Sequence, residues 1–98
     1  MVMENKFSPG RLVCSIAGRD AGRVYIIIDV LSETMVQVVD GKIRKLSAPK
    51  KKNIKHLMAY SQKAGEIEEK KNSGQRITDL EVRNVLQRLM AETLVKRG

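Results

Sequence analysis

Two short apolar segments separated by a glycine-flanked loop constrain the fold of this chain more than any other feature. The segments span residues 12–16 and 24–30, and both are rich in β-branched side chains. Each is too short for an independent helix, so both are predicted to be strands. Gly18 and Gly22 lie in the intervening loop and permit the positive φ angles of a sharp turn. The pattern predicts a β-hairpin.

The same loop carries two arginines, Arg19 and Arg23. A tight turn would hold both guanidinium groups at its tip, and the planar guanidinium binds phosphate through two parallel hydrogen bonds. We expect Asp20 to stabilise the loop through an Asx-type hydrogen bond rather than to contact a ligand. The glycines are required for the turn whatever the ligand.

Three further strands are predicted after the hairpin, over residues 35–39, 42–46 and 53–57, with Ile43 available to the core. Asp40-Gly41 is a strong signal for a two-residue hairpin turn, so Gly41 is predicted to be a third turn glycine. Five short strands at this spacing favour a small closed or nearly closed barrel followed by helix. The predicted organisation is a loose lead-in at residues 1–9, a barrel at 10–58 and a helical extension at 59–98.

The C-terminal third carries the clearest helical signal. Thr78 and Glu81 have the spacing of a capping box. After them, one face at 3.6-residue spacing contains Val82, Val85, Leu86, Leu89, Met90 and Thr93. We predict an amphipathic helix over 79–95 whose apolar face covers the barrel, because a barrel of under about 60 residues is only marginally stable alone. A weaker helix is predicted over 61–71, with Ala64 and Ile67 as its apolar side.

Composition narrows the function classes. The net charge of +8 favours a polyanionic partner. The chain has one cysteine, no apolar run approaching 18 residues and no signal-peptide pattern at its start, so we expect a cytoplasmic protein without a membrane partner. Cys14 and His56 lack a third residue that would orient them, and one cysteine and one histidine do not make a zinc site. No catalytic residue, metal or cofactor is predicted.

The positive charge is concentrated in one region. Residues 42–55 contain seven cations and no acid, namely Lys42, Arg44, Lys45, Lys50, Lys51, Lys52 and Lys55. Together with Arg19 and Arg23 these are the predicted RNA-binding residues, because a field focused on one face attracts a polyanion. The chain has three aromatic residues, Phe7, Tyr25 and Tyr60, too few for a platform of stacked bases. Recognition of the RNA backbone is therefore expected.

The segments with this charge carry a family resemblance. Residues 10–23, GRLVCSIAGRDAGR, resemble a KOW motif. Residues 40–45 and 49–57 are similar to the archaeal and eukaryotic large-subunit ribosomal protein family L-fourteen and to its small bacterial relatives, KOW-domain RNA-binding proteins. Residues 77–83 resemble the helix of those bacterial relatives. The resemblance implies an SH3-like barrel, Gly22 as the fixed turn residue, and ribosomal or other structured RNA as the ligand. Ala21 stands where the family commonly has lysine, which shifts the expected contact toward residues 50–55.

Two functions follow as competing hypotheses. The first is a non-catalytic RNA-binding protein that acts in translation, with association with the ribosome as its more specific form. The second is a KOW-type protein-interaction module of a transcription or translation factor, which would make a protein contact through the C-terminal helix. The first hypothesis depends on Lys50, Lys51 and Lys52, whereas the second depends on apolar helix residues such as Val82 or Leu89.

Overall fold

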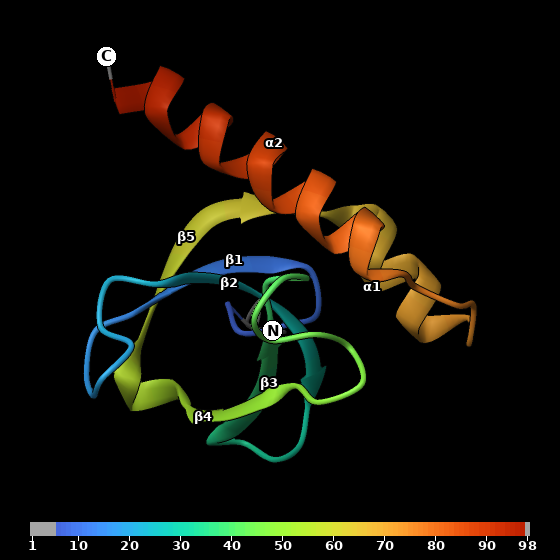
Figure 1. Cartoon of the computed structure of the whole chain (residues 1–98), viewed down its shortest axis with the longest axis horizontal. Coiled ribbons are helices and arrows are strands. Elements are labelled where there is room, and N and C mark those ends of the chain that lie inside the picture. The colour runs from blue at the N-terminus through green and yellow to red at the C-terminus, as the bar shows by residue number, and fades with distance from the viewer. Residues whose placement is uncertain (1–5, 98) are drawn as a thin grey trace, which may run out of the picture.

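The chain forms a five-stranded antiparallel sheet and two α-helices, which confirms the prediction of a mainly β fold with α (Figure 1). The structure is a computed structural model that describes residues 6–97. Its elements are β1 (Arg11–Ser15), β2 (Val24–Val30), β3 (Met35–Val39), β4 (Lys50–Asn53), the 3₁₀ helix η1 (Ile54–His56), β5 (Leu57–Lys63), α1 (Gly65–Asn72) and α2 (Asp79–Arg97).

The order of strands in the sheet is β4-β3-β2-β1-β5. The three residues of η1 connect β4 to β5, which are the two outer strands, so the sheet must curl strongly to bring its edges together. Two register shifts, one in the β1–β5 pair and one in the β2–β3 pair, contribute to this curl, because a bulge bends and twists its strand. Figure 1 shows the strands wrapped around a central space, with both helices outside it.

Alternation along the strands supplies two apolar cores, one on each face of the sheet. The inner core, enclosed by the curl, consists of Val13, Tyr25, Ile27, Val36, Val38 and Leu57. The helix-side core consists of Leu12, Ile26, Ile28, Val39, Ala64, Ile67, Val82, Val85 and Leu89. The central strands β1 and β2 are thus buried on both faces, which explains why their sequences read as nearly continuous apolar runs.

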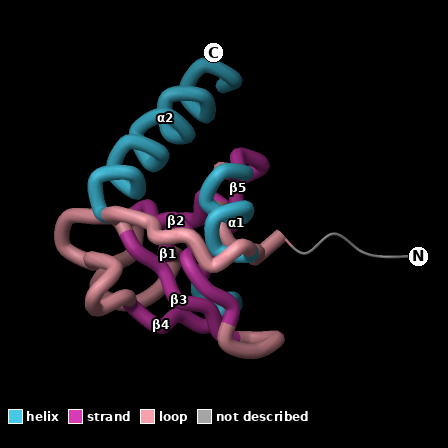
Figure 2. The backbone as a smooth tube through the Cα atoms, turned by 90° about the vertical axis from the view of Figure 1, so that its right-hand side faces the viewer, coloured by secondary structure: helices cyan, strands magenta, loops and turns pink. Residues whose placement is uncertain are grey.

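Helix α2 forms as the periodicity predicts. The hydroxyl oxygen of Thr78 accepts a hydrogen bond of 3.2 Å from the backbone N–H of Glu81, which confirms the predicted cap. Val82, Val85 and Leu89 are buried against the sheet. Figures 1 and 2 show the start of α2 beside α1, and its C-terminal part extending beyond the sheet.

The predicted strand over 42–46 is wrong, because this segment is a loop. A single carboxylate oxygen of Asp40 accepts hydrogen bonds of 2.9 to 3.0 Å from the backbone N–H groups of Lys42, Ile43 and Arg44. This folds the chain into a local turn, so its backbone groups are satisfied without a strand partner. Ile43 is 66% exposed and does not reach the core, contrary to the prediction.

The predicted strand over 53–57 is also wrong. The fourth strand lies earlier, on the lysines of β4, and the fifth begins at Leu57 and continues to Lys63, past the expected end of the barrel at residue 58. The shorter helix α1 begins at Gly65 rather than residue 61, although the buried residues at its start, Ala64 and Ile67, are those predicted. Part of the lead-in, residues 1–5, lies outside the described residues, and Phe7 packs against the inner core.

Gly41 joins the 40–46 loop to α2. It has a φ of +79°, and a Cβ at this position would lie 2.6 Å from the carbonyl oxygen of Asp79 and 2.8 Å from Cγ of Arg83. Arg83 in turn donates a 2.8 Å hydrogen bond to the Gly41 carbonyl. Gly41 is therefore a turn residue, as predicted, but it serves contact with the helix and not a two-residue hairpin.

We predict that Gly41→Ala lowers the free energy of unfolding by about 2–4 kcal/mol, because it combines an unfavourable φ with overlap against α2. Gly74→Ala is the matched control, since Gly74 also has a positive φ, +72°, but open space where the Cβ would be. The control should lose only about 1 kcal/mol. Urea denaturation of both variants measures the difference, and equal losses would show that the loop yields without disturbing α2.

Candidate nucleic-acid interface

A buried carboxylate, Asp20, organises the loop between β1 and β2. Its Oδ1 accepts hydrogen bonds from the Ser15 hydroxyl at 2.9 Å and the Lys52 ammonium at 2.8 Å. Its Oδ2 accepts one from the Tyr25 hydroxyl at 2.7 Å and lies 3.0 Å from Nζ of Lys50. Side chains from β1, β2 and β4 thus converge on one loop residue. The predicted stabilising role of Asp20 holds, although it acts through these strands and not through an Asx turn.

The network fixes the charge of its members. Burial alone would raise the pKa of the Asp20 carboxyl, but the hydrogen bonds from Lys52, Tyr25, Lys50 and Ser15 outweigh burial and hold that pKa well below its usual range. Burial and the hydrogen bond to Asp20 raise the pKa of Tyr25 to about 12. At neutral pH the site therefore holds an ionised carboxylate and a protonated phenol.

Strand alternation divides the lysine run of β4. Lys50 pairs in register with Val38 and Lys52 with Val36, so both lysines share the inward face of those buried valines. Lys51, opposite Gln37, points the other way and is exposed. Lys52 is only 7% exposed. The structure gives this predicted RNA ligand a different place, because its ammonium is inside the protein and neutralises Asp20.

Above this network the structure brings four predicted cations together. Arg19, Arg23, Arg44 and Lys50 line a surface depression of about 200 Å³ with Asp20 and Tyr25 in its wall. We call this hollow, together with the four cations that line it, the basic depression. Arg19 and Arg23 are exposed at the loop tip, as expected. The φ angles of Gly18 and Gly22, +85° and +94°, confirm the glycine turn that holds them there.

Arg44 reaches this depression because α2 holds its loop in place. Oδ1 of Asp79, in the first turn of the helix, accepts a 2.8 Å hydrogen bond from the backbone N–H of Leu46. The hydrogen bond from Arg83 of α2 to the Gly41 carbonyl is a second link between the helix and this loop. Sequence reasoning missed Asp79 and Arg83 as residues that support the site. Their contacts cross more than 30 positions of the chain, and no local pattern reports such contacts.

The remaining predicted cations lie outside the depression. Lys42, Lys45, Lys51 and Lys55 are all exposed, on the 40–46 loop, β4 and η1. Only Lys50 and Lys52 among the nine predicted cations form an ion pair with a described residue, and both pair with Asp20. Seven cations are thus left with free charge toward solvent, within the part of the chain that the structure describes.

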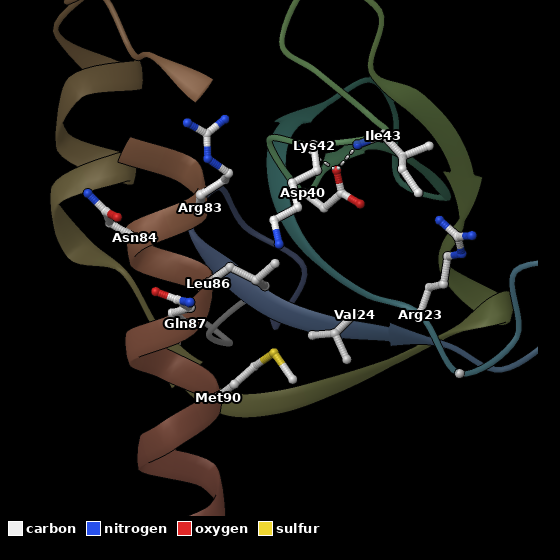
Figure 3. A pocket seen from close by; sticks show the side chains of 11 residues that line it. Arg23, Val24, Asp40, Lys42, Ile43, Arg83, Asn84, Leu86, Gln87 and Met90 are labelled. Atoms are coloured by element: carbon white, nitrogen blue, oxygen red, sulfur yellow. Dashed lines mark hydrogen bonds between the residues drawn. The ribbon is translucent and has the colours of Figure 1, made fainter. Parts of the chain in front are cut away.

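A second and larger hollow adjoins the basic depression. It has a volume of about 540 Å³ and lies between α2, the β1–β2 loop and the 40–46 loop. Figure 3 shows Val24 of β2 and Leu86 and Met90 of α2 pointing toward one another, with the Lys42 side chain reaching toward them from the loop. Arg23 and Ile43 line both hollows, so the two surfaces are continuous. We call this hollow the α2 groove.

The one cysteine and the one histidine of the chain lie on different elements. Cys14 is half-buried on β1, and His56 is exposed on η1. Among the described residues, no three potential metal ligands of the His, Cys, Asp or Glu type gather in one place. No helix within that same part of the chain has the length and apolar character needed to cross a bilayer. A comparison of the chain with models of known protein families finds no match.

We predict that Asp20→Asn lowers the free energy of unfolding at pH 7 by about 3–5 kcal/mol, because it leaves the buried Lys52 ammonium without a counter-charge. Since the pKa of Asp20 is lowered by folding, its contribution is present above the ordinary pKa and disappears on acidification. Wild-type stability should therefore decline between about pH 5 and pH 2, and the variant should lack this part of the decline.

Urea denaturation across this pH range is the measurement. The double variant Asp20→Asn/Lys52→Met is the control, because it also removes the buried ammonium, and it should recover at least half of the loss. A single variant as stable as the wild type would contradict the role given to the network.

Proposed function

We propose that this protein is a non-catalytic RNA-binding protein that grips the backbone of structured RNA. The basic depression is the observation that carries the proposal. Four cations from three separate segments converge around one carboxylate, and three of them, Arg19, Arg23 and Arg44, have no ion-pair partner among the described residues. Such clusters raise the local potential and attract polyanions.

The residue types that line the depression suit the phosphates of a nucleic-acid backbone. Arginine forks bind phosphate oxygens in pairs, and exposed lysines nearby add point charges along the same strand. A-form RNA hides its base edges in a deep, narrow major groove, so proteins hold it by phosphates and 2′-hydroxyls. Arg19, Arg23 and Arg44 form the centre of the proposed contact, with Lys42 and Lys45 beside them on the 40–46 loop. Lys51 points away from Lys50 on β4 and Lys55 lies on η1, so the centre of the proposed contact does not include them.

Asp20 has a positioning role in this proposal. Its carboxylate is buried and fully engaged, so it adds little repulsion toward an approaching phosphate while it fixes the loop that carries both arginines. Fixing the loop before binding reduces the entropy lost when RNA is bound.

The fold is consistent with the family resemblance. We infer that the curled sheet, with a 3₁₀ turn between its two outer strands, is the SH3-like barrel of a KOW domain. Membership of the L-fourteen-like family would make ribosomal RNA of the large subunit the natural ligand and translation the process. Cosedimentation with large ribosomal subunits, abolished when the arginines are changed, is the result expected from a ribosomal role.

The protein-interaction hypothesis depends on apolar residues of α2 that are buried in the structure. Val82 and Leu89 are 0% and 2% exposed, because they pack in the helix-side core.

Charge reversal of Lys50, Lys51 and Lys52 is unsuitable as a test of RNA binding, since Lys50 and Lys52 belong to the Asp20 network. The informative substitutions are therefore at the arginines of the basic depression.

We predict that Arg19→Gln/Arg23→Gln/Arg44→Gln weakens binding of a fully paired RNA hairpin at least about 30-fold near 0.1 M salt. The slope of log affinity against log salt should also fall in magnitude by about 2–3, roughly one for each phosphate that the variant no longer neutralises. Fluorescence anisotropy over a salt series measures both quantities.

The matched control is Lys63→Gln/Lys71→Gln/Arg76→Gln, which removes the same formal charge near α1. Two of these cations pair with Glu68 and Asp29 on the surface, so little stability depends on them. The control should bind within about threefold of the wild type. Equal losses in both triple variants, or equal binding to B-form DNA of the same sequence, would contradict the proposed site.

A further inference from the structure

The α2 groove differs in chemistry from the basic depression that it adjoins. Val24, Leu86 and Met90 form its apolar part, and Met90 is 40% exposed although it faces the hollow. The opposite wall is formed by Lys42, Ile43 and Arg23, and Ile43 is 66% exposed. An apolar hollow of about 540 Å³ left open to solvent has the size of a site for a small, flat, partly apolar group.

The charge around the groove indicates what kind of group this is. Lys42 and Arg23 form no ion pair with any described residue. The acid in the wall, Asp40, has one oxygen occupied by three backbone N–H groups. A ligand in the groove therefore meets an apolar floor and a cationic rim, which suits a planar base attached to phosphates.

We propose that the α2 groove receives the base of one unpaired nucleotide in the RNA whose phosphates lie on the basic depression. The inference rests on the proposed function and adds to it a preference for RNA with a bulge or an unpaired end. Continuity supplies the argument, because Arg23 and Ile43 line both hollows and a strand that crosses one passes over the other. Unpaired bases are the parts of RNA that proteins contact most directly.

Each groove residue has a distinct role in this arrangement. Met90 and Leu86 contact one face of the base, since the thioether of methionine is polarisable and adapts to flat groups. Lys42 holds the phosphate at the mouth of the groove. Arg23 holds the preceding phosphate, where the groove meets the basic depression.

A peptide is a less suitable occupant. Extended peptides commonly bind by adding a strand to an exposed sheet edge. The strand residue in the groove, Val24, belongs to β2, which already has β1 and β3 on either side. The groove thus offers no free edge. Asp40, the acid in its wall, is engaged by its own loop, so a peptide of mixed charge would meet mainly cations.

The test compares five RNA hairpins that differ only at one bulged position. Both have the same paired stem and a single-nucleotide bulge, carrying either a base (each of the four in turn) or an abasic sugar. The abasic hairpin retains the phosphates and the flexibility of the bulge. Wild-type protein should bind at least one base-containing bulge about tenfold more tightly than the abasic bulge.

Two exposed residues on α2 provide the variants. Met90→Asn makes the groove polar, and we expect it to bring the tenfold preference to near one without changing affinity for the abasic hairpin. Leu80→Asn is the matched control, because Leu80 is 56% exposed on the same helix and does not line the groove. Circular dichroism melting confirms that both variants fold, and the control should keep the full preference.

The outcomes separate this inference from the proposed function. If the wild type binds all bulged and abasic hairpins equally, or if Met90→Asn keeps the preference, the inference is wrong while RNA binding stands. If no hairpin binds, the proposed function itself fails. If the Met90 methyl resonance shifts with an acidic, apolar peptide and not with bulged RNA, the groove is a protein site and the inference is overturned.

Discussion

The ion pair between Asp20 and Lys52 is the interaction on which the basic surface depends. Buried ions are expensive to desolvate, and a pair survives inside a protein when further hydrogen bonds satisfy its oxygens. Here the Ser15 and Tyr25 hydroxyls supply those bonds. Because the partners come from the β1–β2 loop, from β1 and β2, and from β4, the pair ties the arginine loop to the sheet.

The sequence predicts those elements whose signals are local. β1, β2, β3 and α2 agree with their predicted spans to within about two residues, because each is specified by its own periodicity and its own turn or cap. The errors lie where a side chain elsewhere decides, in one case a nearby residue of the same turn and otherwise a distant one. The segment 42–46 has an alternating strand pattern, but Asp40 satisfies its backbone and Asp79 holds it against α2. The lysines of β4 resemble a solvated run until Asp20, 32 positions away from Lys52, provides an inward partner.

The candidate site divides in the same way. Arg19 and Arg23 could be predicted because the turn glycines lie beside them in the sequence, whereas the Asp20 network that fixes their loop could not. Arg44 was identified by its charge, but its place beside them follows from the docking of its loop on Asp79 and Arg83, which no sequence pattern reports. The α2 groove could not be predicted at all, since it exists only where a helix, a strand and two loops meet. Sequence reasoning thus identified the charged residues and missed the tertiary contacts that arrange them.

The distribution of ion pairs argues that the free charge has a function beyond solubility. Several described cations around the helices have acidic partners, as in Lys63–Glu68, Lys70–Glu81 and Arg88–Glu66. Around the β1–β2 and 40–46 loops, by contrast, the ion pairs among the described residues are those of Lys50 and Lys52 with Asp20, whose carboxylate is buried. Charge selected only to keep a protein soluble would be interspersed with the opposite sign on every face. The unpaired arginines gathered at the basic depression raise the free energy of the folded state through mutual repulsion, and the polyanion proposed to bind there would remove that repulsion. On the proposed function, the basic depression is therefore more stable with RNA bound than without it.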